Sequence, residues 1–222
     1  MANENGTTAA QKYGLLTSIF SSTGVVLLFI GSQRCNFIKF TDTSGTSEPV
    51  SLQYGIWYFL YWSVVSSIDG LFAFESCHHY GDLIEMDASW KAARAFSVLS
   101  YIFGIILIVS SCIAMCDNDT AKTTPSWQAP LYFLTALFTG LTLLFLNSNA
   151  CHNNTAVNLQ DMKMGNVIFP ETCSIATGAK MTISSTVFFG LAAATSFLGV
   201  KATKAEFAMN ESSAGLDEPL NP

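Results

Sequence analysis

The side chains of this 222-residue sequence that are best suited to chemistry lie between positions 77 and 94. They include one cysteine, two histidines and three acidic residues: Cys77, His78, His79, Asp82, Glu85 and Asp87. These are metal-ligating types, but a zinc site needs three or four ligands that converge on one ion. Neighbouring residues of an extended segment point to opposite faces, and a disulfide-bonded cysteine offers no thiolate. We therefore expect no metal ion and no other cofactor.

Other patterns that could carry chemistry are equally weak. Cys112 and Cys116 are separated by three residues, which differs from the Cys-x-x-Cys spacing of thiol oxidoreductases. No glycine-rich phosphate loop, nucleophile elbow or zinc-protease motif occurs in the sequence. We expect no catalytic residue and no enzymatic activity. Cys116 is a candidate for S-palmitoylation because it falls at the end of an apolar segment, and an inert buried thiol is the alternative.

The composition indicates a membrane protein. Half of the residues are hydrophobic, 12% are charged and the mean hydropathy is +0.38, whereas soluble domains carry about 25% charged residues. The net charge of −6 disfavours nucleic acid as a partner, because phosphate binding needs a basic face. The expected partners are the lipid bilayer and either further copies of this chain or another membrane protein.

Four apolar segments are long enough to cross a bilayer, which takes about 20 helical residues. They predict an all-α membrane protein built as a four-helix bundle, with spans at 13–32, 93–115, 130–146 and 181–200. The remaining segments are an N-terminus, two long loops, a short link and a tail expected to be disordered: 1–12, 33–92 and 147–180, 116–129, and 201–222. No span has an ionisable residue near its middle, which disfavours an ion or proton pathway. Small residues four apart, Ala136 and Gly140 and also Gly190 and Ala194, predict close helix packing, with contacts inside the bundle favoured over a lateral dimer.

The cysteines and one sequon predict which side the loops face. Each long loop holds two cysteines, Cys35 and Cys77 in the first and Cys151 and Cys173 in the second. Such pairs indicate an oxidising compartment, and Asn153 begins an N-glycosylation sequon in the second loop. We therefore expect disulfide-stapled extracellular loops, cytosolic termini and a plasma-membrane location, with the connectivity of the cysteines left open.

The basic residues do not support this orientation. Six lie on the loop side and four on the terminal side: Arg34, Lys39, Lys91, Arg94, Lys163 and Lys180 against Lys12, Lys122, Lys201 and Lys204. The positive-inside rule would place the richer side in the cytosol. An inverted protein with reduced thiols therefore stays an alternative.

The first loop contains a further apolar run, residues 52–68, which reads LQYGIWYFLYWSVVSSI. It is rich in aromatic and β-branched residues and poor in leucine, which favours strands over a lipid-facing helix. Asp69-Gly70 then predicts a turn into a second short apolar run, so a hairpin is expected. A fifth span, which would place the termini on opposite sides, is the alternative.

Three features of this loop resemble the claudin and peripheral-myelin-protein superfamily. Gly55-Ile56-Trp57 is similar to the Gly-Leu-Trp of that family, and Cys77, Tyr80 and Leu83 have the spacing of its Cys-x-x-Tyr-x-x-Leu. Residues 92–95 read Ala-Ala-Arg-Ala, as at the start of the second claudin helix, and place Arg94 seventeen residues after Cys77. Leu60 stands where claudins have their first loop cysteine, and claudins lack a cysteine pair in the second loop. The fungal Sur7-type membrane-organising proteins fit the four-span plan as well.

The resemblance implies a structural function: self-assembly, cell adhesion or the organisation of membrane domains through the two loops. It also implies that Arg94 ties the first loop to the bundle, and Asp69, Glu75 and Asp87 are the acidic residues that could pair with it. We expect Trp57 and Trp62 to be buried under a small sheet, and exposed contact residues are the alternative. An auxiliary subunit of a channel or receptor is a second hypothesis, and a channel or transporter in its own right a third. If a pore exists, the acidic first loop would favour cations.

Overall fold

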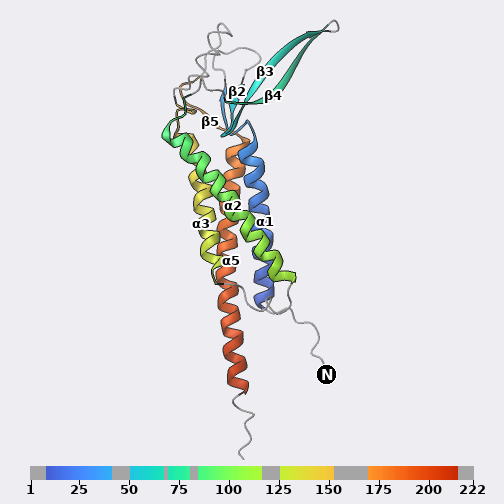
Figure 1. Cartoon of the computed structure of the whole chain (residues 1–222), viewed down its shortest axis with the longest axis vertical. Coiled ribbons are helices and arrows are strands. Elements are labelled where there is room, and N and C mark those ends of the chain that lie inside the picture. The colour runs from blue at the N-terminus through green and yellow to red at the C-terminus, as the bar shows by residue number, and fades with distance from the viewer. Residues whose placement is uncertain are drawn as a thin grey trace, which may run out of the picture.

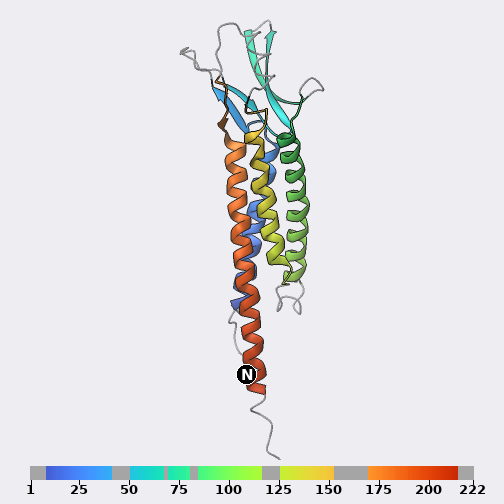
Figure 2. The same ribbon diagram turned by 90° about the vertical axis from the view of Figure 1, so that its left-hand side faces the viewer.

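The computed structural model describes residues 9–41, 51–67, 70–80, 85–116, 126–152 and 170–214. Its helices are α1 Ala9–Gln33, α2 Ala88–Cys116, α3 Gln128–Leu141 with a 3₁₀ continuation η2 Thr142–Asn147, and α5 Thr177–Ala214. They stand side by side as a bundle, with the sheet gathered at one end (Figures 1 and 2). α1 begins and α5 ends at the end of the bundle that lies opposite the sheet (Figure 1).

Four helical segments are long and apolar enough to cross a membrane: Gln11–Gln33, Ala88–Ile113, Gln128–Asn147 and Thr177–Ala205. They confirm the prediction of four apolar helices and define a multi-pass membrane protein. Each begins a few residues before the predicted span. The prediction of a disordered tail from residue 201 is wrong as far as Ala214, since α5 continues to that residue. Residues 201–214 contain many good helix formers and neither glycine nor proline, which explains the extension.

The loops form one antiparallel sheet of five strands in the order β4-β3-β2-β1-β5. The strands are β1 Ile38–Thr41, β2 Ser51–Tyr54, β3 Tyr58–Ser67, β4 Gly70–His79 and β5 Ser174–Ile175. The first four come from the first loop and β5 from the second. Ile38 pairs with Tyr54 on one side and with Ile175 on the other, so β1 joins the two loops into one unit.

The described part of this apolar run, residues 52–67, forms β2, a short turn and β3, so the alternative of a fifth span is wrong and the expected hairpin is confirmed. Its aromatic and β-branched residues suit a pleated strand, as the sequence indicated. Gly70 already belongs to β4 and pairs with Ser67. The link therefore consists of residues 68 and 69, which lie outside the described residues, rather than of the Asp69-Gly70 turn that we expected.

Small residues determine how closely α1 and α5 approach each other. A Cβ atom added to Gly31 would lie 2.8 Å from the carbonyl oxygen of Gly178, and one on Gly178 would lie 2.6 Å from that of Gly31. Further along the same pair of helices, the hydroxyls of Thr17 and Thr195 are 2.8 Å apart, and Ser185 donates a 2.7 Å hydrogen bond to a carbonyl of α1. Interhelical hydrogen bonds and small residues are what hold helices together where lipid supplies no hydrophobic drive.

The two predicted small-residue pairs fare differently. Ala136 is buried in the bundle core beside Phe189 and Ala192, as expected. Gly190 and Ala194 are exposed on the outer face of α5, so the prediction that they pack inside the bundle is wrong. The neighbouring Ala192 and Ala193 turn inward instead. In an alanine-rich helix, the spacing of small residues does not show which face packs inside the bundle.

Candidate functional site

Two disulfides staple the sheet to the bundle. One joins Cys35, two residues beyond α1, to Cys77 in β4, with 5.9 Å between the Cα atoms. The other joins Cys151, just after η2, to Cys173, just before β5, with 4.8 Å between the Cα atoms. Each loop is thus closed on itself, which settles the connectivity that the sequence left open. In the chain-entropy model, loops of 42 and 22 residues correspond to about 4 and 3 kcal/mol of stabilisation.

The Gly55-Ile56-Trp57 segment forms the turn between β2 and β3. The N–H of Gly55 donates a 2.7 Å hydrogen bond to the carbonyl of Tyr58. A Cβ atom at Gly55 would overlap the carbonyl oxygen of Arg34 and would lie 2.9 Å from the Cα of Cys35. This turn therefore presses against the backbone that leaves α1, and only glycine fits there.

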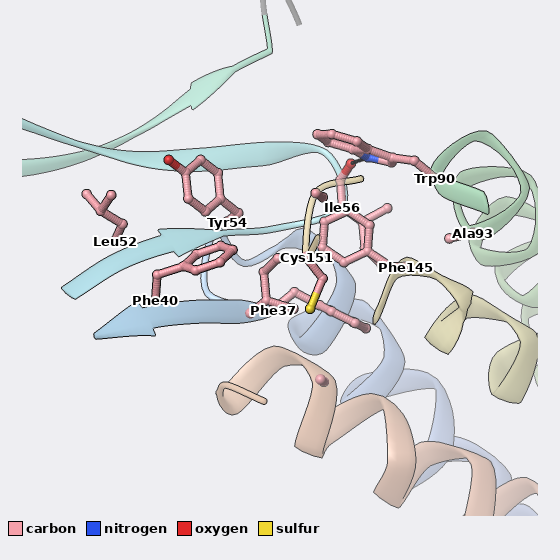
Figure 3. Close-up of a cluster of buried hydrophobic side chains, with 12 residues drawn as sticks. Phe37, Phe40, Leu52, Tyr54, Ile56, Trp90, Ala93, Phe145 and Cys151 are labelled. Atoms are coloured by element: carbon pink, nitrogen blue, oxygen red, sulfur yellow. Dashed lines mark hydrogen bonds between the residues drawn. The ribbon is translucent and has the colours of Figure 1, made fainter. Parts of the chain in front are cut away.

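Three side chains hold the carbonyl groups of this turn. Tyr80 donates a 2.7 Å hydrogen bond to the carbonyl of Gly55. The carbonyl of Ile56 accepts two, a 3.1 Å bond from Nε1 of Trp90 and a 2.9 Å bond from Nε of Arg94. Figure 3 shows Trp90 of α2 lying over Ile56. Because Trp90 and Arg94 both belong to the first two turns of α2, the turn is fixed directly to the bundle.

Aromatic rings surround the Arg94 guanidinium. Its Cζ lies 4.9 Å from the ring centre of Trp57 and 5.7 Å from those of Tyr80 and Trp90. Tyr80 and Trp90 meet edge to face at 4.7 Å. Cation–π contacts of this kind contribute more when they are partly desolvated. We call Gly55, Ile56, Trp57, Tyr80, Trp90 and Arg94 the arginine clamp.

The environment of Tyr80 keeps its phenol neutral. Burial raises the pKa of Tyr80 well above its ordinary value, and the repulsion from Tyr54 raises it further. Arg94 acts in the opposite sense but less strongly. The phenol is therefore protonated at physiological pH and able to donate its hydrogen bond to Gly55.

Asp87 serves as the N-cap of α2 and connects the two loops. Its Oδ1 accepts a 2.9 Å hydrogen bond from the backbone N–H of Trp90, and its Oδ2 accepts a 3.0 Å bond from that of Asn149. The Asn149 side chain donates a 2.7 Å bond to the carbonyl of Glu85. The expectation that Asp87 could pair with Arg94 is therefore corrected: it accepts two backbone N–H groups, while Arg94 bonds a carbonyl. The other two acids we considered, Asp69 and the side chain of Glu75, lie outside the described residues.

Beneath the clamp lies an apolar cluster that we call the junction core: Phe37, Ile38, Phe40, Leu52, Tyr54, Ile56, Trp90, Ala93, Phe145, Ala150, Cys151 and Ala179. It draws on the sheet, α2, η2 and α5 at once (Figure 3). Phe145 is central, since its ring meets those of Phe37 at 5.4 Å and Trp90 at 5.3 Å, both edge to face. The core therefore packs the sheet against α2, η2 and α5.

His78 and His79, which we considered as metal ligands, lie on β4 and contact neighbouring residues of the sheet. The His79 ring contacts that of Tyr58 in a tilted arrangement with 4.3 Å between ring centres, and Nε2 of His78 is 2.8 Å from the hydroxyl of Ser76. Among the residues that the structure describes, no group of three or more His, Cys, Asp and Glu side chains could hold a metal ion. Asp82 belongs to the segment 81–84, which is outside the description.

Other residues singled out in the sequence are placed as follows. Trp57 packs against the junction core but is only half-buried, so the expected burial is met in part, and the side chain of Trp62 lies outside the described residues. Asn153, Leu83 and the side chain of Cys116 also lie outside them, so glycosylation and palmitoylation stay predictions. Cys112 is a free thiol that is exposed on α2.

Sequence reasoning missed the capping role of Asp87 and did not single out Trp90 or Asn149. An acidic residue directly before an alanine-rich helical start is an N-cap signal, and Asp87 could have been found by it. Asn149 carries no such signal, because its role depends on where η2 ends in space. The fold and the junction together define a four-helix, multi-pass membrane protein with a disulfide-stapled sheet at one end. No protein-family model matches the sequence, and no curated protein is detectably similar to it.

Proposed function

We propose that this chain is a claudin-like tetraspan protein of the plasma membrane that acts by self-assembly and cell contact, or by organising membrane domains, through its sheet. The loops would face the outside and the termini the cytosol. Both disulfides lie at the sheet end of the bundle, which supports this orientation because structural disulfides persist in oxidising compartments. The turn-and-arginine arrangement of the clamp supports the claudin-like reading.

The observation that carries the proposal is the β3–β4 hairpin. Its strands are ten residues long, about 33 Å at the usual rise per residue, and the hairpin extends away from the bundle (Figures 1 and 2). The base of the hairpin is fixed at Cys77, Tyr80 and the turn at Gly55. A long element held rigidly at its base is suited to present a surface to a neighbouring molecule.

β4 is an edge strand of the sheet, and no described strand pairs with its outer side. An edge of this length offers a row of backbone donors and acceptors to which a further strand can add. The same strand of a second copy is a suitable partner, because two identical edges can pair antiparallel about a twofold axis. Self-assembly through β4 therefore agrees with both the position and the length of the hairpin.

The hairpin register identifies where this edge can be tested. Ser67 pairs with Gly70 across a two-residue link, and in such hairpins the closing pair is hydrogen-bonded. Gly70, Phe72 and Phe74 then direct their N–H groups toward β3, and Ala73, which lies between two of them, directs its N–H outward. Proline at Ala73 would remove an outward donor without removing one that faces β3, whereas threonine at the same position keeps it.

The proposal is tested by expressing fluorescently tagged protein in cells that form no contacts of this kind and imaging borders between expressing neighbours. We expect enrichment at those borders for the wild type and Ala73→Thr, and loss of enrichment for Ala73→Pro and Cys77→Ser at equal surface amounts. Uniform distribution of the wild type over the surface would contradict self-assembly across contacts. A stoichiometric second protein recovered from such cells would then favour the auxiliary-subunit hypothesis.

A further inference from the structure

The basic residues of the loop side are gathered where the helices end. Arg34 directly follows α1, Lys91 is the fourth residue of α2 and Lys180 the fourth of α5, and all three are exposed. Arg94 lies one turn beyond Lys91. We call these four residues the basic rim. The excess of positive charge on this side, which conflicts with the positive-inside rule, thus lies largely at the end of the bundle.

The rim lies one membrane thickness from basic residues at the other end. Lys12 and Arg34 are 22 residues apart along α1, and Lys180 and Lys201 are 21 apart along α5. At 1.5 Å per residue these separations are about 33 and 32 Å, close to the roughly 30 Å of a bilayer hydrocarbon core. In a bilayer, both sets of cations would therefore lie at the edges of the hydrocarbon core, from which long side chains reach the lipid phosphates.

Lys91 and Arg94 make the best-formed part of the rim. They are three residues apart on α2, so their side chains are neighbours on the helix surface. Ala95, Val98 and Ile102 continue the same face toward the bilayer centre, and the last two are 41% and 48% exposed. A cationic pair above an exposed apolar stripe matches a phosphate group above an acyl chain.

The Arg94 guanidinium is held ready for an anion. Its Nε–H bonds the carbonyl of Ile56, and its plane is fixed by the rings of the clamp. The other N–H groups of the Arg94 guanidinium have no acceptor among the described residues. The terminal N–H groups of arginine suit phosphate oxygens, and an already ordered side chain loses little entropy on binding. The two oxygens of the nearby Asp87 accept backbone N–H groups of Trp90 and Asn149, and none of the described contacts joins Asp87 to Arg94.

We propose that Lys91 and Arg94 bind the phosphate of a phospholipid in the loop-side leaflet, with an acyl chain along Ala95, Val98 and Ile102. The apolar stripe selects a lipid over a free phosphate ion, since the ion would contact only the two cations. The site is independent of self-assembly through β4. It lies on the same helix turns as the clamp, so a bound lipid also stabilises the junction between sheet and bundle.

The test is a titration of the detergent-solubilised full-length protein with dioleoyl phosphatidylglycerol, followed by the midpoint of thermal unfolding. We expect saturable stabilisation of the wild type, with dioleoylglycerol, which lacks the phosphate, and inorganic phosphate each giving little. Lys91→Gln should weaken the apparent affinity about five-fold, as expected for one basic residue at an anionic surface. Val98→Gln should weaken it as well. The matched control is Lys39→Gln, which removes an equally exposed cation from β1 and should leave the titration unchanged.

Each alternative outcome overturns the site. Equal effects of Lys91→Gln and Lys39→Gln would show only a diffuse response to net charge. Equal stabilisation by dioleoylglycerol would show that the acyl chains act without the phosphate. Equal stabilisation by inorganic phosphate would show an anion site that does not select a lipid. Arg94 is left unchanged throughout, because its replacement also breaks the clamp.

Discussion

At the residue scale, the clamp depends on backbone carbonyls rather than on opposite charges. Arg94 and Trp90 share the carbonyl of Ile56, and Tyr80 takes that of Gly55. The backbone conformation of the turn fixes the direction of its carbonyls. The three side chains can therefore bond them only when the turn has this conformation. If an aspartate side chain had been the acceptor instead of these carbonyls, a second charge would have had to be desolvated. The arrangement positions a turn with one cation and avoids a buried ion pair.

Gly55 gives the sharpest prediction at this scale. Gly55→Ala should destabilise the folded protein by more than about 3 kcal/mol, because the new Cβ overlaps the backbone of Arg34 and that backbone is held by the Cys35 disulfide. The thermal unfolding midpoint of purified protein measures this. Gly190→Ala is the control, since a Cβ there meets nothing within 4 Å. An unchanged midpoint for Gly55→Ala would contradict the close approach of turn and helix end.

At the element scale, the start of α2 is where both loops meet the bundle. Asp87 caps the helix and also holds the backbone of Asn149, while Trp90 and Arg94 hold the first loop. The N-terminal turn of one helix thus carries contacts to two segments more than 30 residues away in either direction along the chain. The stability of the junction between sheet and bundle therefore depends on a few residues at the start of α2.

Replacing Asp87 tests this position. Asp87→Ala should cost about 1–2 kcal/mol, because it removes a helix cap and leaves the N–H of Asn149 without its acceptor. Asp87→Asn should cost less, since asparagine also caps helices. Glu85→Ala is the comparison, because Glu85 is exposed and contributes its carbonyl, which alanine retains. Urea unfolding midpoints of the three variants give the order, and an equal loss for all three would contradict the cap.

The elements differ in how far the sequence could predict them. Hydropathy located the four spans, and the aromatic, leucine-poor run at 52–68 indicated strands, because both signals are local. The pairing of β5 with β1 could not be predicted, since two residues carry no periodicity and depend on where α5 begins. The acceptors of Arg94 were missed for a related reason. A backbone carbonyl has the same chemistry in every residue, so only the fold shows which one is near.

At the scale of the whole molecule, the sheet lies at one end of the bundle, and α1 begins and α5 ends at the other (Figure 1). The two disulfides belong to the sheet end. With four spans, this arrangement would place the disulfide-bonded cysteines and Cys112 on opposite sides of the membrane. Cys35, Cys77, Cys151 and Cys173 belong to the sheet end, and Cys112 lies near the far end of α2. The separation makes the proposed orientation open to a chemical test.

Intact cells that express the protein should be treated with a membrane-impermeant reductant and then with an impermeant maleimide. We expect labelling of the sheet-end cysteines only after reduction, and without permeabilising the cells, because the proposed orientation exposes them outside. A variant with Cys112→Ser and Cys116→Ser should label equally. If labelling instead requires permeabilisation, the orientation is inverted, and Asn153 would then carry no glycan.

α5 gives the molecule a mechanical property that its four-span plan does not require. It is a single helix of 38 residues, about 57 Å long, with no proline in it. Its first turns are packed under the sheet at Gly178 and Ala179, and its last turns extend past the other helices (Figure 2). Because Gly178 lies against the backbone of α1 and Thr195 meets Thr17 further along, α5 is held to α1 over several turns. The part of α5 beyond the other helices is therefore a rigid extension whose direction is set at the sheet end.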